Sequence, residues 1–419
     1  MKSFNTLAGA MLASTLFAGA ALAQTELTMW YHGAGNDNEM KLVNEMLDEF
    51  NASQPDWKVV ITAFPQAAYN DSVVAGALAG TLPDIIDIDG PILPNWAWSG
   101  YIQPLKIDES LIKDYLPGPK GVWNGKLYGI GMWDAAISLV TRQSYLDELK
   151  LRKPTLDQPW TADEFQAALD AAKNSGKFEY ALDLGTAWTG EWYPYAFSPL
   201  LQSFGGDLID RTTYSTAEGA LNGDAAMAWG KWWQHLFTDG YAQATQDPAE
   251  RDSGFATGKY AFSWNGNWAA LGALKAFDDV LFLPAPNFGA GSKIGAASWQ
   301  LSISASSKHP DGANAFINFA LQPKNLARFS KGLGLIPATA AAAELTDNYK
   351  VGGPLNVFFD LSNRQGVLRP VTPGYPVMAK IFEKAASDIA HGADVAATLD
   401  AAVDEINADI EKNKGYAAQ

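Results

Sequence analysis

The sequence predicts an α/β protein with two domains, and three observations support this class. Over the first 90 residues, short apolar segments alternate with segments whose apolar residues recur at helical spacing, the pattern of a parallel sheet with covering helices. The chain of 419 residues is longer than one hydrophobic core usually organises. Beyond the N-terminus there is no second long apolar segment, so a membrane-spanning protein is not expected.

The alternation is clearest near the N-terminus. Strands are predicted at residues 27–31, 57–64 and 83–88, with helices at 39–50 and 71–80 between them. Ligands of parallel sheets bind beyond the carboxyl ends of the strands. The side chains expected at that rim are Tyr31, His32 and Asn36 after the first strand, and Asp87 and Asp89 at the end of the third.

The N-terminus itself has the pattern of a secretory signal peptide. Lys2 precedes an apolar run at 7–20, and Ala21-Leu22-Ala23 is a small-x-small cleavage site. Cleavage after Ala23 would leave no cysteine for a lipid anchor, and the chain has none for disulfides or thiolate metal sites. The sequence therefore predicts a soluble protein of the periplasm.

Charge and composition narrow the choice of partners. The net charge of −16 is dispersed, so the chain should be repelled by phosphate backbones and no nucleic-acid partner is expected. Fifteen tryptophans and fifteen tyrosines favour a sugar ligand, because aromatic faces stack on the C–H faces of pyranose rings. The alternative is that these residues fill the core.

The middle of the chain contains two local signals and one unusual stretch. Asn124-Gly125 predicts the turn of a hairpin at 123–130, and Thr161 with Glu164 has the spacing of a capping box at a helix start. Residues 188–195 (Trp-Thr-Gly-Glu-Trp-Tyr-Pro-Tyr) gather aromatics around one carboxylate in a segment broken by glycine and proline. We interpret this stretch as a loop that contributes to a site, or else as a packed irregular loop.

Residues 254–269 join a helix end, a strand and a turn. Gly258 should close a short helix, 260–264 should form a buried strand, and 265–267 should reverse the chain. Trp268 stands just past the turn, where its flat apolar surface is either core or a stacking platform. Near the C-terminus, helices are predicted at 377–391 and 396–412 after a Pro/Gly-rich loop.

The pattern Phe-x-x-Gly-Lys-x-Ala-x-x-x-x-Gly-x-Trp-Ala at 255–269 is similar to a motif of a known family. It resembles the carbohydrate-binding members of the bacterial extracellular solute-binding proteins, the maltose-binding-protein-like group that serves ABC importers. Supporting stretches occur in the same order at 27–32, 82–87, 123–130, 159–165 and 304–319. The resemblance covers nearly the whole chain after the signal peptide.

The resemblance implies a two-lobed periplasmic binding protein fold of type II. Each lobe would be a mainly parallel sheet flanked by helices, with a ligand cleft between the lobes. The implied N-terminal lobe is 24–133 and 287–322, and the C-terminal lobe is 134–286 and 323–419, after the signal peptide at 1–23. The chain would first cross between lobes after residue 131, cross again at 280–286, and cross a third time near Leu321.

The implied function is capture of a sugar, an oligosaccharide or glycoside, by hinge closure, with delivery to ABC permease subunits in the inner membrane. The resemblance implies a monomer without cofactor, metal or enzymatic activity. The ligand-binding residues carried over are His32, Asn36, Asp89, Asp134, Trp188, Gly190, Glu191, Asn265, Trp268, Trp299 and Arg369.

Two other function classes remain open. A secreted glycoside hydrolase needs two carboxylates held a few ångströms apart, and Asp89, Asp134 and Glu191 could meet in a cleft. A solute-binding protein for a polyamine or organic acid is the second. Arg369 could recognise an acidic substituent, bridge hydroxyls or form a structural ion pair. The four histidines show no zinc-ligand spacing.

Overall fold

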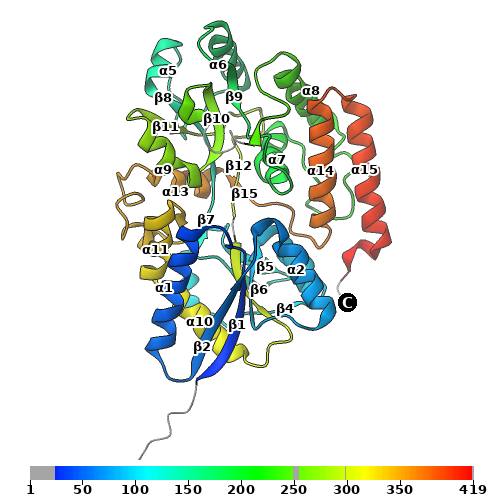
Figure 1. Cartoon of the computed structure of the whole chain (residues 1–419). Coiled ribbons are helices and arrows are strands. Elements are labelled where there is room, and N and C mark those ends of the chain that lie inside the picture. Colours follow the sequence, from blue (N-terminus) through cyan, green and yellow to red (C-terminus); the bar gives the residue numbers. More distant parts are fainter. Residues whose placement is uncertain (1–23, 249–253, 298, 418–419) are drawn as a thin grey trace, which may run out of the picture.

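The computed structural model describes residues 24–248, 254–297 and 299–417, and Figure 1 shows two α/β lobes joined by short strands. The two-lobed α/β class predicted from the sequence is confirmed. The predicted signal peptide at 1–23 lies outside the described residues. Among the residues that the structure describes, no helix combines the length and apolar character needed to cross a membrane.

The N-terminal lobe, lower in Figure 1, is built on a seven-stranded sheet. The strands lie in the order β2 (Trp57–Ala63), β1 (Thr25–Tyr31), β3 (Ile85–Asp89), β13 (Trp299–Ser304), β6 (Lys126–Ile130) and β5 (Lys120–Trp123), and β4 (Ile102–Gln103) pairs with β13. Its helices are α1 (Asp37–Ser53), α2 (Gln66–Ala79), α3 (Leu93–Trp98), α4 (Glu109–Ile112), α10 (Pro310–Ala320) and α11 (Pro323–Leu333).

Helix α1 shows how the pattern of the sequence becomes packing. Its buried residues include Val43, Met46, Leu47 and Phe50, which recur at helical spacing along one stripe. Each large side chain removed from water in this way contributes about 1.5–3 kcal/mol. The stripe holds α1 on the sheet, so that the chain entering it from β1 is fixed at the carboxyl end of that strand.

The C-terminal lobe has a four-stranded sheet in the order β11 (Val280–Leu283), β8 (Ile137–Arg142), β10 (Tyr260–Gly266) and β9 (Tyr180–Asp183). Its helices include α5 (Gln143–Glu148), α6 (Ala162–Asn174), α7 (Trp192–Phe204), α8 (Asp224–Thr238), α9 (Asn267–Ala276), α13 (Asn356–Gln365), α14 (Tyr375–Ala390) and α15 (Val395–Lys412). Trp229 and Trp233 of α8 are fully buried, so part of the tryptophan excess does fill the core.

The expectation of mainly parallel sheets is wrong in detail, because both sheets are mixed. Strands β2, β1 and β3 are mutually parallel, as the alternation predicted, and β9 is parallel to β10. Strand β13 is antiparallel to β3 and β6, and β8 is antiparallel to β10 and β11. Strand β13 follows the chain's return from the other lobe, so it enters the sheet from the rim where β3 ends.

Short strands mark where the chain passes between the lobes. Strand β7 (Trp133–Asp134) pairs with β14 (Ile336–Pro337), and β12 (Ile294–Gly295) pairs with β15 (Gly366–Val367). The first passage was expected after residue 131, the part of the chain that contains β7. The second was expected at 280–286, but 280–283 forms strand β11 at the edge of the C-terminal sheet, so the passage follows at β12.

The third passage also lies later than expected near Leu321. Leu326 and Phe329 of α11 share one core cluster with Val43 and Phe50 of α1, so α11 still packs in the N-terminal lobe. The chain leaves that lobe at β14 and the following turn of helix α12 (Ala340–Ala343). The observed passage differs from the expected one because α11 is amphipathic and packs its apolar face against α1. This contact joins segments far apart in the chain, so the local sequence does not reveal it.

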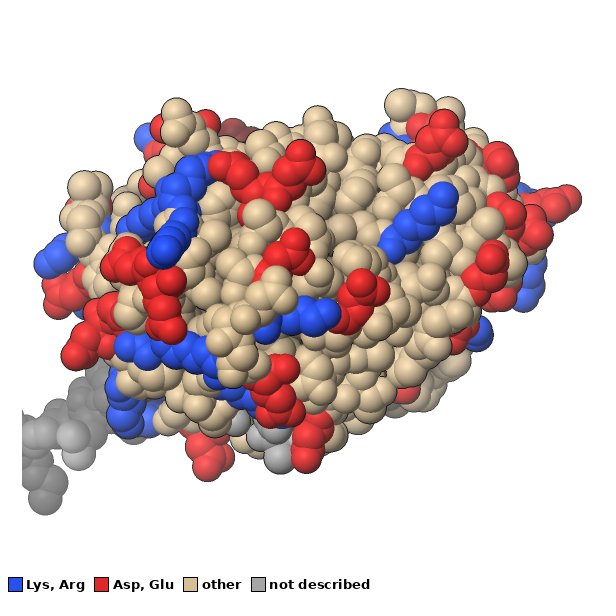
Figure 2. Space-filling view, turned by 90° about the horizontal axis from the view of Figure 1, so that it is seen from above, with Lys and Arg blue, Asp and Glu red and all other residues tan. Residues whose placement is uncertain are grey.

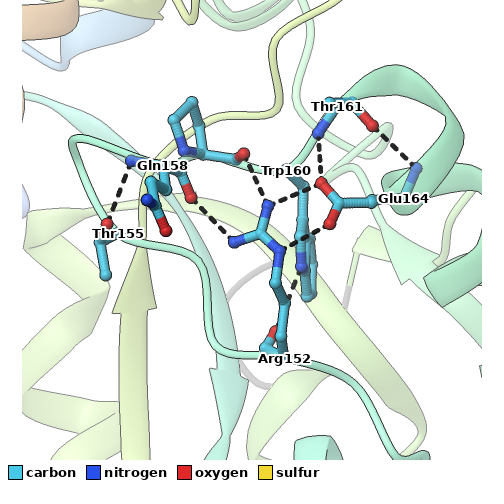
Figure 3. A network of polar contacts seen from close by, with 7 residues as sticks. Arg152, Thr155, Gln158, Trp160, Thr161 and Glu164 are labelled. Atoms are coloured by element: carbon cyan, nitrogen blue, oxygen red, sulfur yellow. Dashed lines mark hydrogen bonds and ion pairs between the residues drawn. The ribbon is translucent and has the colours of Figure 1, made fainter.

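Several local predictions are confirmed. The hairpin turn places Asn124 and Gly125 at positive φ, and Gly258 closes a 3₁₀ turn in the left-handed conformation. The capping box at Thr161 is complete, and Arg152 grips Glu164 with two nitrogens while donating to the carbonyls of residues 158 and 159 (Figure 3). The hydrogen bonds from Arg152 lower the pKa of Glu164 to about 2.

The surface and the C-terminus complete the description. Figure 2, the view from above, shows Lys and Arg side chains interspersed with Asp and Glu over that face, in agreement with dispersed charge. The C-terminal segment returns to the N-terminal lobe, where Nε1 of Trp98 on α3 donates to the carbonyl of Ala417 at 3.0 Å. The ring of Tyr416 meets the same indole edge-on, with 5.3 Å between centroids.

Candidate functional site between the lobes

The carboxyl ends of β1 and β3 and the start of β13 form the N-terminal rim, which contains His32, Asp89 and Trp299. His32 directly follows β1, Asp89 ends β3, and Trp299 opens β13 directly opposite Asp89 in the register of the two strands. The parallel-strand argument therefore placed His32 and Asp89 correctly at one edge of the sheet. Trp299 joins them because β13 runs antiparallel to β3.

His32 is buried beneath Trp299. The imidazole and indole rings are stacked at 3.7 Å between centroids with 5° between planes, and only 5% of His32 is exposed. Nδ1 of His32 is in close contact with Oδ2 of Asp87, and Nε2 lies 3.5 Å from Oε1 of Glu39. Burial alone would lower the pKa of His32, but the charges of Asp87 and Glu39 outweigh it and raise the pKa.

The carboxylate of Glu39 is itself held by two neighbours. The hydroxyl of Tyr31 donates to Oε1 at 2.6 Å, and Nδ2 of Asn36 donates to Oε2 at 2.9 Å. Asn36 is also the N-cap of α1, since its Oδ1 accepts from the backbone N–H of Glu39 at 3.2 Å. Asn36, predicted to bind ligand, thus has a cap role that orients Glu39 towards His32.

The start of α7 and the start of α9 form the C-terminal rim, which contains Trp188, Glu191, Trp192, Tyr195 and Trp268. The ring of Trp268 lies 6.1 Å from Trp192 at 80° and 6.0 Å from Tyr195 at 42°. Trp188 lies 6.5 Å from Trp192. Edge-to-face and tilted contacts at these distances are favourable, so the rings form one aromatic cluster.

Trp268 occupies this position because of the glycine two residues before it. A Cβ on Gly266 would lie 2.1 Å from the indole of Trp268, so only glycine leaves room for the ring. The predicted reversing turn at 265–267 is wrong, since β10 continues to Gly266 and α9 begins at Asn267. Trp268 therefore stands in the first turn of a helix, half-buried, rather than beyond a loop.

The loop expected at 188–195 is also partly wrong, because α7 begins at Trp192. Gly190, with φ of 68°, precedes the helix, and its N–H donates to Glu383 of α14. Pro194 fits because it lies in the first turn, where a backbone N–H has no intrahelical partner. Two functional candidates were missed as individuals, Trp192 and Tyr195, although both lie in the stretch that the aromatic density singled out.

One guanidinium connects the two rims. Nη2 of Arg369 lies 3.8 Å from Oδ1 of Asp89, and Nε lies 3.0 Å from Oε1 of Glu191. Nη1 donates to the carbonyl of Ala296 at 3.0 Å, and the guanidinium carbon stands 4.7 Å from the ring centre of Tyr195. Of the three roles open to Arg369 from the sequence, the structure shows the ion pair.

Glu191 is the most perturbed carboxylate of the C-terminal rim. Burial raises its pKa, while the positive charge of Arg369 acts in the opposite direction. The hydroxyl of Tyr375, at the start of α14, donates to the same Oε1 at 2.5 Å. Asp89 shows the same balance, since burial raises its pKa and Arg369 and His32 counteract the rise.

Two other predicted residues lie apart from these groups. Asp134 is fully buried in β7, where Oδ1 accepts from the N–H groups of Ala135 and Ala297 and Oδ2 accepts from the hydroxyl of Ser362. It holds the passages between lobes together rather than facing a ligand. Asn265 is half-buried in β10, and its Oδ1 accepts from the backbone N–H of Gly266 at 2.8 Å.

Asn267 was missed by the sequence reasoning, which chose Asn265. Its side chain is fully buried, accepts from the N–H of Ala136 at 2.9 Å and donates to the carbonyl of Gly334 at 3.2 Å. It thereby ties α9 to two of the chain segments that pass between the lobes, those at β7 and β14. Only long-range structure distinguishes the two asparagines, because both lie in the same Asn-Gly-Asn triplet.

The three carboxylates considered for a hydrolase are each engaged within the protein. Asp89 and Glu191 share one cation, and Asp134 is sequestered, so the three carboxylates considered for a hydrolase do not form a free pair across an open bond-cleavage site. Within residues 24–248, 254–297 and 299–417, no group of three or more His, Asp or Glu side chains is placed to hold a metal ion. The absence of a cofactor stays a prediction.

Comparison with known proteins defines the class. The model of a family described as bacterial extracellular solute-binding protein matches residues 45–352, well over half of the chain. The chain therefore belongs to that family, as the sequence motifs indicated.

Particular relatives agree with this class. The chain is 27% identical over 360 residues to an uncharacterized lipoprotein of Streptomyces antibioticus, covering 82% of this chain and 78% of that one. It is 23% identical over 325 residues to the multiple sugar-binding protein of Streptococcus mutans, covering 73% and 74%. The GacH receptor of Streptomyces glaucescens has the same fold, with a TM-score of 0.75 at 20% identity, covering 94% of this chain and 100% of that one.

Proposed function

We propose that this protein is the periplasmic receptor of an ABC importer that captures a neutral sugar, an oligosaccharide or glycoside, between its two rims by hinge closure. The observation that carries the proposal is the bridge of Arg369 between Asp89 of one lobe and Glu191 of the other. It places polar groups from both lobes and the aromatic cluster of the C-terminal rim around one interface. Such a combination of ring faces and hydrogen-bonding groups suits a pyranose.

The charges of the interface favour a neutral ligand. Arg369 already faces two acidic side chains, Asp89 and Glu191, so it offers no unpaired cation for an acidic substituent. The Streptococcus mutans relative is named for sugar binding, and the GacH receptor was crystallised with acarbose, which supports a carbohydrate for this chain as well. The division into lobes at the passages described above, cleavage after Ala23, the monomeric state and the permease partner belong to the same proposal.

A ligand screen followed by one pair of variants tests this function. The protein from Gln24 onward is screened by thermal shift against mono- and oligosaccharides, acidic sugars, polyamines and organic acids, because a ligand of the folded state raises the unfolding midpoint. A neutral glycan that raises the midpoint without being consumed supports the proposal. Release of reducing sugar would indicate a hydrolase, and a response to polyamines or acids alone would overturn the sugar assignment.

Trp268→Ala then tests the site. Loss of the indole should weaken binding of the identified glycan by about 10- to 100-fold, since a buried aromatic contact is worth about 1.5–3 kcal/mol. Trp57→Ala is the matched control, because Trp57 is also half-buried but begins β2, at the end of the sheet opposite the rim. Equal loss of affinity in both variants, measured by calorimetry, would remove Trp268 from the site.

A further inference from the structure

His32 cannot serve as a direct ligand contact in this arrangement. Its ring lies under the indole of Trp299 and only 5% of the residue is exposed, whereas Trp299 is half-buried. The edge of Tyr69, from α2, stands 5.6 Å from the indole at 76°. Trp299 is therefore backed on one face by the imidazole, bounded at its side by a tyrosine and packed against the core of the N-terminal lobe, and part of its surface stays exposed at the rim.

Both ring nitrogens of His32 face carboxylates. Nδ1 contacts Asp87 from β3, and Nε2 is 3.5 Å from Glu39 of α1. An imidazole satisfies acceptors on both nitrogens only when both carry protons, so the geometry calls for the imidazolium form. The other titratable groups around it are Asp89 of β3, Tyr31 of β1 and Tyr69 of α2, and these supply no further cation.

The cation lies flat against an indole. A positive charge over the face of tryptophan is attracted by the negative face of the ring, and it is worth more where water is excluded. The attraction fixes the plane of Trp299 before any ligand arrives. A platform that is already ordered costs a ligand less entropy on binding than one that must be ordered at that moment.

We propose that His32 is a positioning residue whose imidazolium, anchored by Asp87 and Glu39, fixes Trp299 as the stacking platform of the N-terminal lobe for a ligand ring. This inference rests on the proposed function for its ligand class, a ring with an apolar C–H face. It replaces the direct ligand contact that the sequence suggested for His32. The claim that His32 fixes the orientation of Trp299 does not depend on which ligand binds.

The experiment has a ligand-free arm that reads the stack itself. A protonated imidazole in contact with an indole quenches its fluorescence, so the emission of the wild-type protein should rise as pH increases through the raised pKa of His32, above 6.5. His32→Gln and Trp299→Phe should each abolish that rise. His309→Gln is the matched control, since His309 also neighbours a tryptophan, Trp57, at 5.8 Å, but on the far side of the lobe.

The second arm measures binding of the glycan found in the screen. His32→Gln should lose about tenfold in affinity at pH 6, and the wild-type affinity should approach that of the variant as pH rises to 9. A wild-type fluorescence rise that persists in both His32→Gln and Trp299→Phe would overturn the platform, as would an unchanged affinity in His32→Gln. If His32→Gln fails to fold, Trp299→Phe alone decides the fluorescence arm.

The two proposals fail in different ways. If no sugar binds the wild-type protein while the fluorescence transition depends on both His32 and Trp299, the stack stands and the sugar assignment fails. If a sugar binds but neither variant changes the titration or the affinity, the receptor function stands and the positioning role of His32 is wrong.

Discussion

The N-terminal rim is ordered by charges and the C-terminal rim by aromatic rings. Behind Trp299 lie a buried histidine and two carboxylates, while Trp268 contacts Trp192 and Tyr195, and Trp188 contacts Trp192 in turn. Charged networks respond to pH and are costly to break, whereas ring clusters contribute area that is insensitive to protons. We therefore expect the orientation of the aromatic surface to depend on pH in the N-terminal rim and not in the C-terminal rim. The C-terminal rim also contains a titratable group, Glu191, whose pKa burial raises to about 8.

Among the variants considered, Asp87→Asn should have the largest effect on stability. It leaves the imidazolium of His32 buried without its closest anion, so we expect a loss of about 3–5 kcal/mol in the free energy of unfolding at pH 6. Since the pKa of His32 is raised in the folded protein, its stabilisation is fully present below pH 6.5 and is lost as pH rises through the folded pKa. The difference in the free energy of unfolding between wild type and variant, measured with urea, should therefore become smaller towards pH 9.

Asp311→Asn is the control for this prediction. Asp311 pairs with Lys106 at 3.6 Å, but its side chain is 83% exposed, so the ion pair is screened and no measurable change in stability is expected. A similar loss in both variants, or a gap for Asp87→Asn that does not vary with pH, would show that charge does not order the N-terminal rim.

On the C-terminal rim, Trp192→Phe should lower the free energy of unfolding by less than Asp87→Asn does, and this loss should not depend on pH. The change removes part of a ring that is 9% exposed, and it leaves the carbonyl of Leu184 without the indole N–H that donates to it at 3.1 Å. We expect a loss of about 2 kcal/mol, equal at pH 6 and pH 9. Urea unfolding at the two pH values measures it, and a loss that changed with pH would contradict an aromatic origin.

Local patterns predicted one part of this site well. His32 and Asp89 follow two parallel strands, and the rule that such strands end at one edge brought them together correctly. The same reasoning could not find that His32 lies under Trp299, because their pairing depends on β13, which enters the sheet after the chain has passed through the other lobe. A partner more than 250 positions away leaves no local signal.

The misread segments have a common physical cause. Pro194 and Gly190 argued for a loop, yet a proline in the first turn of a helix costs no hydrogen bond. Asn265-Gly266-Asn267 has the composition of a turn, yet Gly266 is needed for the space it gives Trp268 rather than for a positive φ. Pro194 and Gly266 are thus explained by their positions in the folded structure and not by the turns that their residue types usually indicate.

The variant with the smallest expected effect, Thr161→Ala, tests whether a loss of stability away from the rims changes ligand binding. Thr161→Ala removes the capping hydrogen bond from the N–H of Glu164, made at 3.2 Å, at the start of α6 and away from both rims. We expect a loss of about 1 kcal/mol in the free energy of unfolding, with unchanged glycan affinity and an unchanged fluorescence titration. Arg152 still grips Glu164 in this variant, so the helix start keeps its second anchor. If ligand affinity fell as much as in the rim variants, overall stability rather than the contacts at the rims would govern binding, and the contrast between charged and aromatic rims would lose its functional meaning.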